Sequence, residues 1–425
     1  TYASGFEYSF GNKMSSGIVQ SLSNSALTWE TTTSTDIGLE LGVLDGRLTF
    51  ETDWYNKVTD GILYKAPVYA TIGNKSAPYQ NLCEVTNTGL ELTLGWKDDI
   101  KDFHYGITAN FTRNWNVVSK YKGRLEAGWV TDENGNRSYK SNIGDVTTTV
   151  GNARRVMEGK LINEFYLLDT YSGDGSHFFA DGSVNPAGGP KDGMIRTPED
   201  MLWLQAMNEA GATFLPNKTI GKKGIWYGDY IYADANGDGV YGDVNDYMFT
   251  GTSMTPKFYY GIQFELGWKG IDFSMLWNGS GGAQCYWRYV GFNAYSTGGY
   301  FTLPKKIAYD HYFYDPENPE DPRTNITSGH ARLTMNYGSE QNDGQCTSKL
   351  FLYDTDYLRL KNLTIGYTFP QKWMKKISVS DFRLFFSGEN LLTFTKYPGM
   401  DPEISDTMNY YALLRQYSFG LSLKF

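Results

Sequence analysis

The last nine residues of the chain alternate strictly between apolar and polar side chains. The apolar series is Tyr417, Phe419, Leu421, Leu423 and Phe425, and the polar residues between them are Ser418, Gly420, Ser422 and Lys424. A period of two is the pattern of a β-strand with one face in an apolar medium and the other in water. The segment therefore predicts a closing strand, either of a soluble sandwich or of a barrel that spans a membrane.

Eight further segments show the same kind of alternation, which gives nine predicted strands: residues 35–43, 48–58, 90–96, 103–112, 258–268, 271–277, 352–369, 382–386 and the closing segment. The alternation that starts at Phe103 continues for over a dozen residues. Strands of soluble sheets average about 5 or 6 residues, whereas a tilted membrane strand needs about 9 to 11. Strand length therefore favours the membrane. A change of phase near Lys361 also predicts a β-bulge.

The predicted strands are joined by connections that alternate between short and long. The short ones are 44–46, 98–102, 269–270 and 370–380, and the long ones are 59–85, 119–255, 282–351 and 391–412. Bacterial outer-membrane barrels have short periplasmic turns and long extracellular loops in this arrangement. The last strand then runs toward the periplasm, and parity places residue 1 outside the cell. An odd strand count further predicts that more strands precede this sequence.

This topology predicts an all-β fold, an antiparallel transmembrane β-barrel with long extracellular loops. The predicted parts are an extracellular loop at 1–27, barrel strands at 28–118, a long extracellular loop at 119–255, a barrel hairpin at 256–281, a further extracellular loop at 282–351 and closing barrel strands at 352–425. An aromatic content of 16% and 47 glycines suit a protein made of strands and turns.

Composition excludes several classes of function. No run of about 18 apolar residues is present, which rules out a helical membrane span. A net charge of −9 with scattered basic residues argues against nucleic acid as a partner. Cys83, Cys285 and Cys346 are an odd number at no metal-ligand spacing, so we expect no disulfide framework and at least one free thiol. The four histidines are isolated, and we predict neither an enzyme nor an organic cofactor.

Several motifs, in order, resemble the C-terminal barrel portion of the SusC-like TonB-dependent transporters. They are Leu27–Glu30 with Asp36–Leu39, Asp53–Lys57, Asn87–Glu91, Asp234–Gly239, Leu358–Leu363, and Gly388–Leu391 through Tyr397 to Asp401–Glu403. The resemblance implies a barrel of about 22 strands in the bacterial outer membrane, of which these are the closing nine. It also implies a plug and a TonB-contacting segment N-terminal to this sequence, and a SusD-like lipoprotein over the extracellular mouth.

For function, the resemblance implies TonB-dependent import of oligomeric nutrients, with glycans as the first choice of cargo and oligopeptides as the second. An alternative from another class is an extracellular glycan-binding or glycan-cleaving β-protein, in which the aromatic residues would form a surface platform. A barrel used for anchoring or assembly is a third interpretation. The predicted partners are the lipoprotein, the TonB complex, outer-membrane lipid and the oligosaccharide or peptide substrate.

The segment 234–246 begins like a calcium-binding loop. It has oxygen ligands at positions 1, 3 and 5 and a glycine at position 6, but position 12 is Asn245 instead of a bidentate carboxylate. The alternative is a plain turn, because Asp, Asn and Gly favour turns without any ion. The candidate ligands for Ca²⁺ are Asp234, Asn236, Asp238, Val240, Asp243 and Asp246.

Three other features carry predictions. Thr197-Pro198-Glu199-Asp200 predicts the N-terminus of a short helix over 198–210, with Thr197 as N-cap and an acidic residue three positions later. Aromatic residues in the predicted loops could stack on sugar rings or anchor the loops, and the candidates for substrate contact are Trp226, Tyr286 and Trp287. The terminal Phe425 resembles the signal that the outer-membrane insertion machinery reads.

Overall fold

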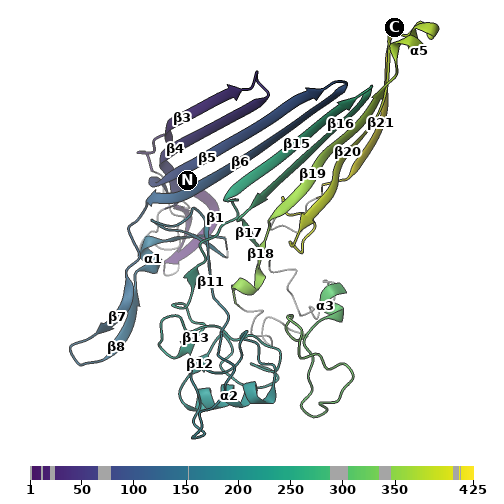
Figure 1. The fold of residues 1–425 in the computed structure, drawn as a ribbon. Coiled ribbons are helices and arrows are strands. Elements are labelled where there is room, and N and C mark those ends of the chain that lie inside the picture. Colours follow the sequence, from purple (N-terminus) through teal and green to yellow (C-terminus); the bar gives the residue numbers. More distant parts are fainter. Residues whose placement is uncertain are drawn as a thin grey trace.

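The computed structural model describes residues 2–10, 13–19, 24–65, 78–151, 153–287, 305–334, 346–404, 411 and 413–425. Its dominant feature is one antiparallel sheet of nine strands in the order β21-β20-β19-β16-β15-β6-β5-β4-β3 (Figure 1). These strands are β3 (Thr31–Val43), β4 (Leu48–Lys65), β5 (Tyr79–Ile100), β6 (Phe103–Lys120), β15 (Phe258–Trp268), β16 (Ile271–Gly281), β19 (Tyr357–Thr368), β20 (Asp381–Thr395) and β21 (Gln416–Lys424). The nine predicted strands and their antiparallel order are confirmed.

Short turns join the strands at one end of the sheet, and long connections leave from the other end (Figure 1). At the hairpin of β15 and β16, Lys269 and Gly270 have φ values of 47° and 88°. Two consecutive positive φ values are what a two-residue type I′ turn requires, and its twist matches that of the strands. The short connection 370–380 contains helix α5 (Gln371–Met374) and the 3₁₀ turn η5 (Lys375–Ile377).

The sheet has one apolar face whose side chains are exposed. Phe419 and Phe425 are 84% and 88% exposed, and the same holds to a lesser degree along the other strands for Ile37, Leu39, Leu41, Leu94, Phe111, Leu266, Ile271, Ile365, Leu384, Leu421 and Leu423. A contiguous apolar face of this size on a water-soluble surface would aggregate. Its composition is that of the lipid-facing band of a membrane barrel.

A β-bulge interrupts β19 at Lys361. The register with β20 shifts between Leu360 and Asn362, and the register with β16 shifts at the same place. An inserted residue moves the side chains that precede it to the opposite face of the sheet. Tyr357 and Arg359 therefore share the polar face, although continuous alternation from Ile365 would have placed them on the apolar one. The predicted bulge is confirmed.

The long connections fold into a second body at the far end of the sheet from the short turns (Figure 1). Its elements include α1 (Ile143–Val146), β9 (Thr148–Val150), β10 (Arg154–Val156), β11 (Glu164–Leu167), α2 (Pro198–Glu209), β12 (Thr213–Phe214), β13 (Val240–Tyr241), β14 (Met248–Phe249), β17 (Gln284–Tyr286), α3 (Lys305–Tyr309), η4 (Lys349–Phe351) and β18 (Leu352–Asp354). A hairpin of β7 (Ala127–Thr131) and β8 (Arg137–Ser141) projects from it. The predicted helix is confirmed, with Thr197 as its N-cap.

The principal core of this body draws on two of the long connections. Its buried side chains are Tyr171, Met194, Ile195, Met201, Trp203, Leu204, Met207, Phe214, Ile225, Tyr227, Tyr230 and Ile231 from the first, and Tyr312 and Ala331 from the second. Burial of this much aromatic and aliphatic surface makes the two connections one folded unit instead of separate flexible loops.

Three parts of the structure differ from the prediction. Residues 1–27 are predicted as a loop without a period, but a hairpin of β1 (Tyr2–Phe10) and β2 (Lys13–Val19) lies there. The predicted strand 352–369 is divided into β18 and β19, because β18 leaves the large sheet to pair with β17. Strands β4, β5 and β20 extend beyond their predicted ends.

No disulfide is formed by Cys83, Cys285 or Cys346, and all three thiols are buried. The prediction that the chain has no disulfide framework is confirmed. Within the described ranges, no helix has the length and apolarity needed to cross a membrane.

Candidate functional site

The face of the sheet opposite the lipid-facing one is polar and rich in carboxylates. Glu40 on β3 lies directly opposite Glu51 on β4, and Asp53 on β4 lies opposite Glu91 on β5. Like charges at directly opposed positions repel each other. This arrangement is tolerable where water or a counter-charge reaches the face, as in the lumen of a barrel. We call this side of the sheet the lumen face.

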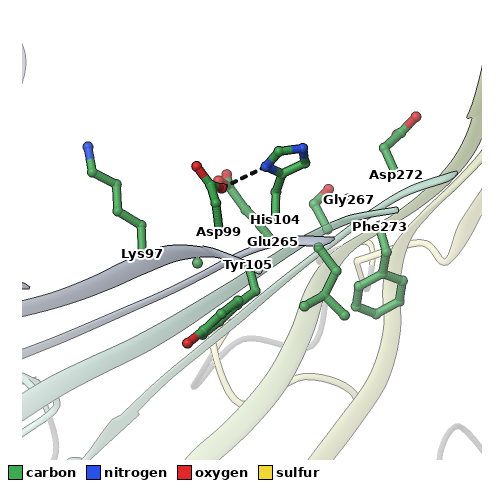
Figure 2. Close-up of a pocket in the computed structure, with 11 residues that line it drawn as sticks. Lys97, Asp99, His104, Tyr105, Glu265, Gly267, Asp272 and Phe273 are labelled. Carbon is green, nitrogen blue, oxygen red and sulfur yellow. Dashed lines mark hydrogen bonds and ion pairs between the residues drawn. The ribbon is translucent and has the colours of Figure 1, made fainter. Parts of the chain in front are cut away.

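Near the short turns, residues of β5, β6, β15 and β16 line a pocket of about 340 Å³. Figure 2 shows Asp99, His104 and Glu265 projecting from one side of the strands, while Tyr105 and Phe273 project from the other. His104 Nδ1 and Asp99 Oδ1 are 2.6 Å apart. The alternation predicted from the sequence thus separates a charged side from an apolar side at the level of individual residues.

A cross-strand ion pair braces the same face. Arg383 on β20 donates from Nε to Asp272 Oδ1 on β16 at 3.0 Å, across the intervening strand β19. The residue beneath the pair is Gly366, and a Cβ there would lie 2.5 Å from both side chains. Glycine is therefore required for the close approach of the pair to the sheet.

Toward the long connections, the lumen face changes from carboxylates to neutral amides and a phenol. The Tyr55 hydroxyl donates to Asn114 Oδ1 at 3.2 Å, and Asn116 Nδ2 donates to Asn87 Oδ1 at 2.7 Å. Amide and hydroxyl groups can both donate and accept hydrogen bonds. This part of the wall can therefore exchange hydrogen bonds with the hydroxyls of a sugar or the backbone of a peptide.

Part of the first long connection folds back over the lumen face at the ends of β5 and β6. The Ile162 amide donates to Asn116 Oδ1 at 2.9 Å, and the Val118 amide donates to the Lys160 carbonyl at 2.8 Å. Val85 and Val118, which lie opposite each other on this face, are consequently buried. The second body is thus attached to the lumen face at the ends of β5 and β6.

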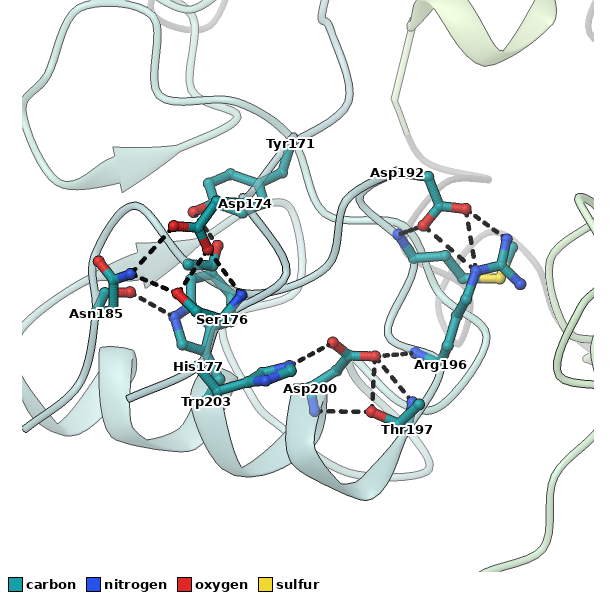
Figure 3. Close-up of polar contacts among 12 residues, drawn as sticks. Tyr171, Asp174, Ser176, His177, Asn185, Asp192, Arg196, Thr197, Asp200 and Trp203 are labelled. Carbon is teal, nitrogen blue, oxygen red and sulfur yellow. Dashed lines mark hydrogen bonds and ion pairs between the residues drawn. The ribbon is translucent and has the colours of Figure 1, made fainter. Parts of the chain in front are cut away.

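Helix α2 is fixed within the body by a buried carboxylate (Figure 3). Asp200 accepts hydrogen bonds from the Thr197 amide at 2.9 Å and the Arg196 amide at 3.0 Å, and its Oδ1 lies 2.8 Å from His177 Nε2. Thr197 Oγ1 accepts the Asp200 amide in return, which completes a capping box. The body is therefore specified by polar contacts as well as by its core.

Two arginines join the first and second long connections. Arg332 makes a two-pronged ion pair with Asp229, with both nitrogen–oxygen distances at 3.0 Å. Arg196 Nη1 donates to the carbonyls of Ile326 and Ser328 at 2.7 and 2.8 Å. Planar guanidinium groups form such paired contacts with defined geometry. They fix the relative position of segments more than 100 residues apart.

The Asp- and Gly-rich loop, residues 234–246, is closed by its own carboxylates. Asp234 Oδ1 accepts the Gly237 amide at 2.7 Å, and Asp246 Oδ1 accepts the Ala235 amide at 2.7 Å. Burial raises the pKa of Asp246 to about 6. Among the described residues, no group of three or more His, Cys, Asp or Glu side chains is arranged to hold a metal ion. Calcium binding by this loop stays a prediction.

The three aromatic candidates for substrate contact lie in separate environments. Trp226 is half-buried against the core of the body and packs edge-on against Tyr227. Tyr286 in β17 packs edge-on against Phe351, and Trp287 lies 5.7 Å from the Tyr397 ring. Tyr286 and Trp287 are adjacent, but Trp226 belongs to a different cluster. Their role in substrate binding stays a prediction.

Phe425 follows directly after β21 on the exposed apolar face. The backbone there is held by the Ser380 amide and hydroxyl, which both donate to the Lys424 carbonyl, at 2.7 and 2.8 Å. The role of Phe425 as an insertion signal stays a prediction.

Comparisons with known proteins agree with this architecture. The family model described as TonB dependent receptor-like, beta-barrel matches residues 1–189. TonB-dependent receptor P3 of Formosa agariphila is 27% identical over 433 residues, which cover 98% of this chain and 36% of the relative. TonB-dependent receptor SusC of Bacteroides thetaiotaomicron is 22% identical over 99% of this chain and 34% of its own length. The chain spans about a third of the length of these curated relatives.

Two solved structures have the same fold. The RagAB peptide transporter is 20% identical with a TM-score of 0.65, over 98% of this chain and 38% of the other. The RagAB peptide importer in its 'open-open' state is also 20% identical, with a TM-score of 0.66 over 99% and 37% of the two chains. Residues 1–189 thus match the β-barrel of the TonB-dependent receptors, and the chain as a whole has the strand architecture of these bacterial outer-membrane barrels.

Proposed function

We propose that this chain forms part of an importer that moves oligomeric nutrients inward across the outer membrane, driven by TonB. The observation that carries the proposal is the lumen face, where carboxylates such as Glu51 and Glu265 and amides such as Asn114 line one side of strands whose other side is apolar. A polar wall inside a lipid-facing barrel suits a hydrated passage. A barrel used only as an anchor would have no need of such a wall.

A SusD-like lipoprotein is the proposed partner at the extracellular mouth. The support is the similarity to SusC and the second body, which we place outside the cell and call the extracellular body. Its arginine contacts and core give a partner a preformed surface. Preformed surfaces bind with a smaller loss of conformational entropy than flexible loops do. Co-purification of a lipoprotein with the tagged full-length transporter would support this partner, and purification of the transporter alone from the native membrane would oppose it.

Glycans are the proposed cargo. Neutral amides and a phenol on the upper lumen face, together with the aromatic residues Trp226, Tyr286 and Trp287, are groups that bind sugar hydroxyls and sugar rings. Oligopeptides are the second candidate, because the structural neighbours with the same fold are titled peptide transporter and peptide importer. The same amides could bind a peptide backbone, so the geometry supports both cargoes.

Growth of a deletion strain decides between the two cargoes. The strain and its complemented parent are grown on a panel of defined glycans and on defined peptides as the limiting nutrient. We expect the deletion to lose growth on one class of glycan and to regain it on complementation. Normal growth on every glycan with failure on peptides would overturn the glycan assignment and support the second candidate.

Calcium is proposed as a structural ion of the loop 234–246. The support is the spacing of Asp234, Asn236 and Asp238, which provide oxygen ligands at alternate positions before Gly239. Backbone amides already occupy some of these oxygens, so calcium would have to share them.

A further inference from the structure

Arg359 is buried on the lumen face, where the other charged side chains are accessible to water. It is 1% exposed, yet the bulge at Lys361 turns it toward the lumen face. A charged residue at this depth must be paired, and the group that covers it must itself lie inside the lumen. The covering group is the segment 396–404, which follows β20.

The Arg359 guanidinium holds this segment through two carboxylates. Nη2 donates to both oxygens of Asp401 at 2.9 Å, and Nη1 donates to Glu403 Oε2 at 2.7 Å. Nε donates to Thr393 Oγ1 on β20 at 3.0 Å. Lys361 Nζ lies 3.5 Å from Glu403 Oε2, so two cations balance two anions. The net charge of the cluster is zero, and the Arg359 side chain donates four hydrogen bonds within it.

The other end of the segment 396–404 closes over the connection that leaves β16. The Tyr397 hydroxyl lies 3.9 Å from Cys285 Sγ, and the Tyr397 ring lies 5.7 Å from the ring of Trp287. At Gly399, a Cβ would lie 2.6 Å from Trp287, so the backbone approaches the indole closely. The segment therefore bridges the barrel wall and the extracellular body, and it covers a thiol that is 0% exposed.

We propose that Arg359 is a positioning residue which, through Asp401 and Glu403, fixes the segment 396–404 against the lumen face and thereby limits the size of molecules that enter there. The inference goes beyond the proposed import function, because it holds for any cargo. A buried ion pair is costly to break on one side, so the segment is a fixed constriction and not a mobile lid. The bulge at Lys361 places Arg359 on the lumen face.

Cys285 provides a reporter for the position of the segment. The full-length transporter is prepared with Cys83→Ala and Cys346→Ala, so that Cys285 is the one thiol contributed by this chain. Whole cells are then treated with a membrane-impermeant maleimide, in a small form and in a form carrying polyethylene glycol. Arg359→Met removes the clamp, and Arg383→Met is the matched control, because Arg383 pairs with Asp272 on the same face without contacting the segment.

We expect Arg359→Met to raise the labelling rate of Cys285 at least about tenfold, since breaking one side of a buried pair releases the segment, and to admit the larger reagent. Arg383→Met should label at the parental rate. Unchanged labelling of Arg359→Met, or an equal rise in both variants, would overturn the proposal. If Arg359→Met does not reach the membrane folded, Asp401→Asn with Glu403→Gln tests the same contacts with isosteric side chains, and the same outcomes apply.

Discussion

Asp200 offers the most direct test of how the second body is held together. Its carboxylate is 6% exposed and accepts hydrogen bonds from the Arg196 amide, the Thr197 amide and the Thr197 hydroxyl, in addition to its contact with His177. Asp200→Ala removes a capping interaction worth about 1 kcal/mol. It also leaves two partly buried amides, those of Arg196 and Thr197, without an acceptor, at about 1 kcal/mol each.

The summed cost is about 3 kcal/mol, which corresponds to a roughly hundredfold rise in local opening of α2. Hydrogen exchange of peptides from residues 198–209, followed by mass spectrometry on the full-length protein in detergent, measures this directly. The control is Glu199→Ala in the same helical turn, where the side chain is exposed. Exchange that rises less than about threefold in Asp200→Ala, or equally in both variants, would refute the assignment of the carboxylate as the principal tie.

Three further outcomes are expected. Leu94 lies on the lipid-facing side of β5, and a cation near the bilayer midplane costs about 2–4 kcal/mol. Leu94→Arg should therefore reduce the amount of folded barrel that heat-modifiability gels detect in outer-membrane fractions. Thr93→Arg on the lumen face should be tolerated, and equal losses in the two variants would contradict the assignment of faces. Calorimetric titration of calcium into chelator-treated protein should show binding that Asp238→Ala abolishes, and no binding to the intact protein would remove the calcium proposal. Deletion of Phe425 should lower the yield of barrel in the membrane while leaving synthesis unchanged, and an equal yield would end its role as an insertion signal.

The nine strands could be predicted because the membrane imposes a strict two-residue period on every segment that crosses it. Prediction failed where that constraint ends. Strand β4 continues past Val58 through a register shift near Gly61, whose φ is 76°. Strand β20 continues past Phe386 through Asn390, which has a φ of 53°. Both irregularities break the alternation while the hydrogen-bonded ladder goes on.

The site was harder to predict because its contacts join residues distant in sequence. The cap of α2 is local, and the spacing of Thr197 and Asp200 in the sequence predicts it. By contrast, nothing in the sequence pairs Arg359 with Asp401 or Arg332 with Asp229, since the partners are 42 and 103 residues apart. The change of phase at Lys361 could be recognised in the sequence. Its consequence, a buried arginine on the lumen face, could not, because the burial depends on the segment 396–404 that folds over Arg359.

The central claim is that the sheet has a lipid-facing and a lumen face with strict alternation between them. Spin labels placed one at a time at Ile262, Gln263, Phe264, Glu265 and Leu266 on β15, in the full-length protein reconstituted into bilayers, test it most directly. Labels at 262, 264 and 266 should collide mainly with lipid-dissolved oxygen, and labels at 263 and 265 mainly with a water-soluble nickel complex. Accessibility without a two-residue period, or with the two sets reversed, would contradict the account.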